Sequence, residues 1–213
     1  MVSLPPGPCE IDFERFLMLT YVRFADSLSA WFGKAFAWLI ILMTFGTAYE
    51  VLVRYVFNAP TPWSLDVAFI MYGTLFMMGG AYTLSRGGHV RGDFLYRLWP
   101  PKVQAGVDLV LYFVFFFPGV LALVFAGFKY ASRSFGYAEV SVNSPAGIPI
   151  FQFKAVIVAA GLLLLIQGVA EVFRCIMCLR TGIWPAPPDD VKETEDLLMD
   201  EAAKAETRSG GLS

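Results

Sequence analysis

The stretch that decides the fold runs from Arg54 to Asp93: RYVFNAPTPWSLD, then nineteen residues without a charge, then RGGHVRGD. The uncharged middle, Val67–Ser85, is long enough to cross a bilayer, because about 20 apolar residues rising 1.5 Å each span roughly 30 Å of hydrocarbon. The chain's most distinctive polar residues flank this span: Arg54, Trp63 and Asp66 before it, and His89, Arg91 and Asp93 after it. We therefore expect the chain to be built around this membrane span.

The composition indicates a membrane protein. Hydrophobic residues make up 57% of the 213 and charged residues only 16%, whereas a soluble domain averages about 45–50% apolar and 25% charged residues. The acidic excess lies after Pro185, and the remainder is mildly basic without a stripe of basic residues, so we expect no nucleic-acid partner. The first apolar run begins near Trp31, after an acidic N-terminus, which argues against a cleavable signal peptide.

Four apolar runs predict an all-α integral membrane domain over residues 31–180, with spans at about 35–57, 64–85, 109–128 and 154–175. Pro118-Gly119, in the middle of the third run, predicts a kink. Residues 129–154 are rich in turn-forming residues and predict a loop.

The segments outside these spans predict interfacial helices and a tail. Within residues 1–30, apolar residues recur every three or four positions after Ile11, typical of an amphipathic helix on the membrane surface. A helical extension of the first span, packed on a partner, is the alternative. Residues 86–108 have one apolar face and predict a second surface-lying helix, closed by Pro100-Pro101. Residues 181–213 form an acidic segment that we predict to be a disordered cytoplasmic tail.

The positive charges predict the orientation. Four spans put the N-terminus, the 86–108 loop and the C-terminus on one side of the membrane. That side holds eight positive residues near the span ends and the opposite side holds four. The positive-inside rule therefore predicts that both termini of this multi-pass chain are cytoplasmic.

Ionisable residues inside a membrane are candidates for function. The candidates here, which lie near the predicted span ends, are Glu50, Arg54, Asp66, Lys154 and Glu171. Such positions favour residues that lock the bundle or contact a partner over a solute site, which usually lies at mid-membrane. Glu50 and Arg54 are four apart and can pair on one helix face. Gln167 predicts a hydrogen bond between helices.

No catalytic residue, metal site or cofactor is expected. His89 is the only histidine, which excludes a haem held by two histidines of one chain. Cys175 and Cys178 have redox-pair spacing, but they fall at the predicted cytoplasmic end of the fourth span, where thiols are kept reduced. Two alternatives stay open: a membrane redox protein, using thiols or haem, and a self-sufficient small transporter.

The order of these motifs resembles the small permease subunit of the tripartite ATP-independent periplasmic (TRAP) transporters, the DctQ-like family. The matching features are an arginine after the first span (Arg54), a tryptophan and acidic residue entering the second (Trp63, Asp66), and a Gly-His-hydrophobic segment ending in Asp (His89 to Asp93). The family usually has two adjacent acidic residues after the tryptophan, where this chain has Leu65-Asp66. Matches to a longer branch of the family follow at Ser141, Pro149, Phe151, Lys154, Gln167-Gly168 and Glu171.

The resemblance implies a function in the bacterial inner membrane. The chain would bind a large permease subunit and act as its fixed brace. A sodium gradient would drive uptake of an organic acid delivered by a periplasmic substrate-binding protein. Arg54, Trp63 and Asp66 would form the periplasmic end of the subunit contact, and His89 and Asp93 would mark the cytoplasmic loop.

Overall fold

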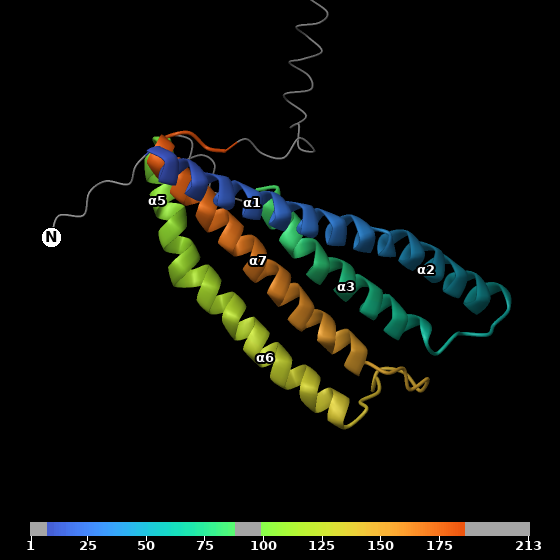
Figure 1. Cartoon of the computed structure of the whole chain (residues 1–213). Helices are drawn as coiled ribbons and strands as arrows, with labels where there is room; N and C mark the ends of the chain where they lie inside the picture. The colour runs from blue at the N-terminus through green and yellow to red at the C-terminus, as the bar shows by residue number, and fades with distance from the viewer. Residues whose placement is uncertain (1–7, 88–98, 186–213) are drawn as a thin grey trace, which may run out of the picture.

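Four long apolar helices, each antiparallel to the next, form the chain in a computed structural model that describes residues 8–87 and 99–185 (Figure 1). The segments long and apolar enough to cross a membrane are Phe13–Val56, Ser64–Ser85, Pro101–Gly136 and Phe151–Thr181. Within the described residues the only β-pairing is an isolated bridge between Val140 and Pro149. The predicted all-α, four-span membrane fold is therefore confirmed.

The first span is the second half of a long rod. Helix α1 (Pro8–Ala37) and helix α2 (Leu39–Val56) are separated only by Trp38, whose backbone angles are themselves helical, and they run on as one rod in Figure 1. At 1.5 Å per residue this rod is about 70 Å long, more than twice the roughly 30 Å of the hydrocarbon layer. Part of it must therefore incline strongly or lie outside the hydrocarbon.

Helix α1 is packed inside the bundle along one face. Val22, Ala25 and Ser29 are buried, and the helix lies against α3 and α7. A Cβ at Gly33 would lie 2.5 Å from the Tyr82 Cβ of α3, so only glycine permits this close approach. The predicted helix thus exists as a direct extension of the first span. Its placement on the membrane surface stays a prediction.

Helix α3 (Ser64–Ser85) has the bounds that the sequence predicts. The turn before it is short because Asn58, with φ of 51°, takes the left-handed conformation that asparagine tolerates. This turn brings α3 back along α2, and α3 in turn packs on α7.

The third span is longer than predicted and begins earlier. Helix α5 (Pro101–Leu111), the π-helical turn η1 (Tyr112–Phe116) and helix α6 (Phe117–Gly136) form one curved rod (Figure 1). Pro101 occupies the start of α5, where its missing N–H costs nothing, so the Pro-Pro pair begins this helix. The predicted surface helix would fall largely on residues 88–98, outside the described residues.

The irregularity at the proline lies one turn earlier than predicted. Pro118 cannot donate to the helix ladder, and its ring crowds the carbonyl four residues back. The chain responds with the π-helical turn just ahead of it, a form in which each hydrogen bond reaches five residues instead of four.

Helix α7 (Phe151–Thr181) is the centre of the bundle. It packs against α1, α3, α5 and α6, and it holds more buried residues than any other described helix. Its end is set by Gly182, whose φ of 76° allows its N–H to bond the Cys178 carbonyl at 2.7 Å. Because α7 extends past the predicted 154–175 span at both ends, Glu171 lies well inside a helix and not near its end.

The predicted 129–154 loop is shorter than expected, since α6 continues to Gly136 and α7 begins at Phe151. The connection closes on itself through hydrogen bonds from Ser141 N to Ile148 O (2.8 Å) and from Ile150 N to Glu139 O (3.1 Å). It lies at the end of the bundle where α2 ends, opposite the start of α1 and the end of α7 (Figure 1).

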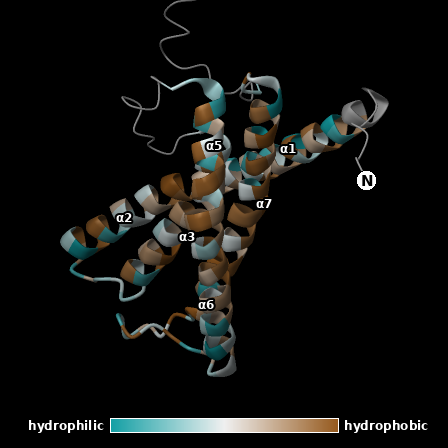
Figure 2. Cartoon of the chain, turned by 90° about the vertical axis from the view of Figure 1, so that its left-hand side faces the viewer, coloured by the Kyte–Doolittle hydropathy of each residue, from teal (hydrophilic) through white to brown (hydrophobic). Residues whose placement is uncertain are grey.

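Large apolar side chains cover the outside of the helices. Phe45, Phe76, Phe115 and Phe125 are each about 70% exposed, at 71%, 68%, 70% and 71%. Figure 2 shows that hydrophobic residues predominate in the middle of the helices and that hydrophilic residues lie toward the ends of α2 and α6. A water-soluble protein rarely exposes so much contiguous apolar surface, whereas a lipid bilayer covers it.

Candidate functional site

Glu50 and Arg54 form the ion pair that their spacing predicts. Glu50 is buried and accepts hydrogen bonds from Arg54 Nη2 at 2.6 Å and Nε at 3.0 Å. Its second oxygen accepts from the backbone N–H of Thr61 at 3.2 Å. The carboxylate therefore joins the end of α2 to the turn that enters α3, while the Arg54 side chain stays 54% exposed.

Asp66 fastens the start of α3 to the connection between α6 and α7. It is only 2% exposed, and its carboxylate accepts hydrogen bonds from the hydroxyls of Ser141, at 2.7 Å, and Ser144. Trp63, at the position just before α3, remains 42% exposed. The two residues that the sequence groups together thus differ: Asp66 points inward and Trp63 lies at the surface.

Lys154 lies beside Asp66 and is held by the same connection. Its buried ammonium pairs with Glu139, which also accepts a hydrogen bond from the Ser134 hydroxyl at 2.7 Å. The ammonium is also 3.9 Å from the centre of the Tyr130 ring, a favourable cation–π position. The Lys154 hydrogen bond, followed by that of Ser134, holds the pKa of the Glu139 carboxyl below its usual value.

These residues make one unit, which we call the loop-end cluster. Its members are Asp66, Ser134, Glu139, Ser141, Ser144 and Lys154. Asp66, Ser141 and Lys154 border a pocket of about 200 Å³ between α3, α6 and α7. Each of the three already has a hydrogen-bond or ion-pair partner within the chain. We therefore interpret the cluster as a contact that fastens α3 and α7 to the connection between α6 and α7.

A second polar unit lies toward the other end of α7. Gln167 is fully buried, and its amide donates to Asp26 at 2.9 Å and to Glu171 at 3.3 Å. It accepts a hydrogen bond from the Ser29 hydroxyl at 2.8 Å. Gln167 therefore joins α7 to α1 by hydrogen bonds.

Arg174 completes this unit, which we call the α1–α7 network: Asp26, Ser29, Gln167, Glu171 and Arg174. The guanidinium pairs with Asp26 at 2.5 Å and with Glu171, and it donates to the Ser85 carbonyl of α3 at 3.5 Å. Charges inside a membrane bundle persist only when they are paired and hydrogen-bonded. The network therefore ties three helices together at a largely buried position in the bundle.

Two of the predicted site residues, His89 and Asp93, lie outside the described residues. The sequence also missed important members of both units. Asp26 and Arg174 are 148 positions apart, and Glu139 precedes its lysine partner by 15, so no short-range spacing connects them. The one available signal was that residues of opposite charge occur on separate apolar helices, where a buried charge needs a partner.

The two cysteines of α7 pack against α5. Cys175 and Cys178 are not disulfide-bonded, and both are buried together with Ala105. Cys178 Sγ lies 3.6 Å from the Pro101 carbonyl oxygen. In the described residues no group of three or more His, Cys, Asp or Glu side chains could hold a metal ion.

Comparison with known proteins identifies a family. The sequence profile described as "Tripartite ATP-independent periplasmic transporters, DctQ component" matches residues 43–178, which include α3, α5, η1 and α6 and most of α2 and α7. The chain is also 23% identical over 128 residues to the sialic acid TRAP transporter permease protein SiaT of Haemophilus influenzae. The aligned part is 60% of this chain but only 19% of SiaT, so the chain spans about a fifth of that relative.

Proposed function

The chain belongs to the DctQ component family of the TRAP transporters, and we propose that it is the small permease subunit that binds and braces a large permease subunit. The observation that carries this proposal is the family match over a four-span bundle whose strongest polar residues are bonded to one another. With those groups used inside the chain, its outer apolar faces are what it offers to a partner.

We place the contact with the large subunit on the outward face of α2. Two threonines and an alanine share this face at helical spacing, and all three are exposed: Thr44, Thr47 and Ala48. The two threonine hydroxyls bond carbonyls of their own helix at 2.8 Å, so neither needs water. Helix contacts within membranes are enriched in such residues, because they let two backbones approach closely.

The flank formed by α5, η1 and α6 also exposes large apolar side chains, including Phe113, Phe115, Leu121, Phe125 and Phe128. Bulky side chains of this kind suit fluid lipid. Helix α2 exposes large side chains too, but it packs mainly on α3, so most of its surface is open to a partner. This open surface, with Arg54 and Trp63 near one end of the helix, supports α2 as the side that receives the large subunit.

We also propose a transport cycle for the complex. The relative SiaT carries sialic acid, an organic acid, in its name, and for this chain we propose an organic acid as the substrate class. A periplasmic binding protein would deliver it, a sodium gradient would drive its uptake, and the present chain would remain stationary. We further propose that it lies in the inner membrane with both termini in the cytoplasm.

A pull-down tests the subunit assignment. The tagged chain is extracted from its native membrane in mild detergent, and the proteins that come with it are identified. If the two subunits form a closed complex, a permease with many helices should copurify with the chain in about one-to-one amount. Recovery of the chain alone, or as a homo-oligomer, would contradict the assignment.

Uptake into liposomes tests the proposed mechanism. Liposomes that contain both subunits and the binding protein should take up substrate only with an inward sodium gradient. Liposomes that contain this chain alone should take up none. Uptake by the chain alone would instead establish a self-sufficient small transporter.

A further inference from the structure

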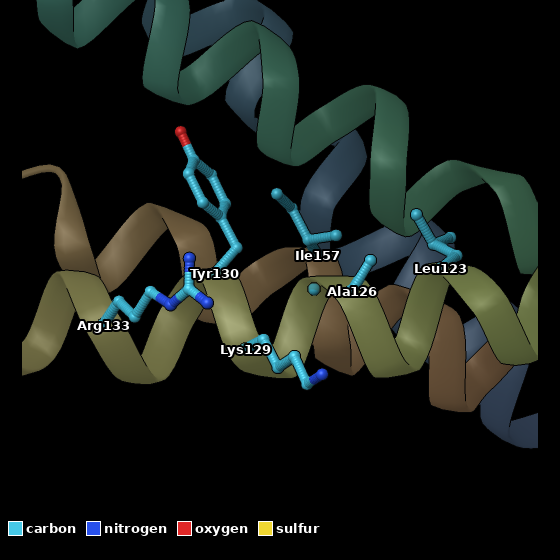
Figure 3. A pocket seen from close by; sticks show the side chains of 7 residues that line it. Leu123, Ala126, Lys129, Tyr130, Arg133 and Ile157 are labelled. Atoms are coloured by element: carbon cyan, nitrogen blue, oxygen red, sulfur yellow. The ribbon is translucent and has the colours of Figure 1, made fainter.

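A groove runs along α6 on the flank that we do not assign to the partner. It encloses about 500 Å³, and Figure 3 shows the side chains that surround it. Its apolar part comes from Leu123, Ala126 and Gly127 of α6 and Ile157 of α7, and its polar border from Lys129, Tyr130 and Arg133.

The two cations on this border are available to a ligand. Lys129 and Arg133 are four residues apart on α6, and both are exposed. Within the described part of the chain neither forms an ion pair with a carboxylate. Lys154, one helix away, is by contrast already paired with Glu139.

The groove has the polarity of a bilayer leaflet. Lys129 and Arg133 lie in the last two turns of α6, where a spanning helix reaches the headgroup layer. Leu123 and Ala126 lie roughly 5–15 Å deeper along the helix axis, toward the middle of the span. A phospholipid has the same order, with its phosphate at the interface and its chains toward the midplane.

We propose that this groove binds one anionic phospholipid, with its headgroup phosphate between Lys129 and Arg133 and an acyl chain along Leu123, Ala126 and Ile157. Tyr130 suits the boundary, since tyrosine concentrates at membrane interfaces. The site stands apart from the subunit contact, because its lining residues belong to α6 and α7 and none to α2. A bound lipid would cover Ile157, which the groove shares with the pocket beside the loop-end cluster.

The test measures lipid retained by the purified full chain. The protein is delipidated in detergent and titrated with phosphatidylglycerol or phosphatidylcholine of identical acyl chains, and bound lipid is counted by native mass spectrometry. Phosphatidylglycerol should be retained in preference. Lys129→Gln with Arg133→Gln should weaken that retention by roughly tenfold or more, because each cation contributes to anionic-lipid attraction.

Two controls separate the site from general effects. Arg15→Gln with Arg23→Gln removes two exposed cations from α1 and should leave retention unchanged. Ala126→Phe fills the groove with both cations in place and should lower retention of either lipid, whereas Leu162→Phe, at an exposed position of α7, should not. Elution volume in size-exclusion chromatography verifies that each variant is folded.

Two results would overturn the proposal. One is equal retention of the two lipids, unaffected by loss of Lys129 and Arg133. The other is an Ala126→Phe variant that keeps its lipid but no longer copurifies with the large subunit, which would make the groove a seat for a partner helix.

Discussion

The two ends of α7 are fastened to the bundle in different ways. In the α1–α7 network, side chains of α1 and α7 bond each other directly, and Arg174 is shared between two carboxylates and a backbone carbonyl of α3. In the loop-end cluster, Asp66 and Lys154 each bond to the connection between α6 and α7, and the Glu139 side chain is 42% exposed. Damage to the buried network should therefore cost far more stability than damage to the loop-end cluster.

The largest effect is expected from Arg174→Met. The change leaves the buried carboxylates of Asp26 and Glu171 without their counter-charge, which costs about 3–5 kcal/mol in known buried ion pairs. The variant should be lost during purification or aggregate on mild heating, as measured by size-exclusion chromatography. The charge-free triple variant Asp26→Asn, Glu171→Gln and Arg174→Met should recover most of the loss. A stable Arg174→Met chain would show that the network does not hold the bundle.

Removal of the two serine donors of Asp66 should have the next largest effect. Ser141→Ala with Ser144→Ala leaves a buried carboxylate without hydrogen-bond donors, a loss of about 1–3 kcal/mol. The midpoint of thermal unfolding in detergent should fall, yet the chain should still be recovered. The control is Ser132→Ala, an exposed hydroxyl that bonds only the Lys129 carbonyl. A loss equal to that of Arg174→Met would remove the proposed difference between the ends.

The close crossing of α1 and α3 gives a matched pair of glycine variants. Gly33→Ala places a methyl group 2.5 Å from Tyr82 Cβ and should cost about 1–3 kcal/mol through overpacking. Gly46→Ala lies on the same rod with no atom within 4 Å and should have no measurable cost. Thermal unfolding of the two variants side by side measures the effect. Equal stability would mean that α1 does not pack on α3 as closely as described.

The smallest effect, and a pH-dependent one, is expected at Glu139. Its pKa is lower in the folded chain than its usual value, so its pair with Lys154 stabilises the fold above that usual value. That contribution is lost as the pH falls through the lowered pKa. Wild type should lose stability relative to Glu139→Gln between neutral pH and about pH 3. Parallel pH profiles for the two chains would exclude this role for the pair.

The sequence predicted what depends on neighbouring residues. The bounds of α3, the Glu50–Arg54 pair and the existence of four spans all follow from local apolar runs and helical spacing. It did not decide between two alternatives for residues 11–30, a helix on the membrane surface and an extension of the first span. An amphipathic pattern identifies the apolar face of a helix, but not whether lipid or protein covers it.

The sequence also did not predict which charged residues pair inside the bundle. Glu171 and Lys154 were candidates, yet Asp26, Arg174 and Glu139 were not recognised as their counterparts. Which charges meet depends on the rotation of each helix about its axis and on its height in the bundle. Neither quantity is determined by the spacing of residues within a single helix.

One measurement tests most directly whether the chain braces a large permease through its α2 flank. Ala48→Trp and Ala122→Trp add the same bulk at exposed alanines of α2 and α6. Each tagged variant is coexpressed with the large subunit, and the permease copurifying per chain is quantified. The account predicts loss of the permease with Ala48→Trp and wild-type recovery with Ala122→Trp. Undiminished recovery with Ala48→Trp, or loss confined to Ala122→Trp, would contradict it.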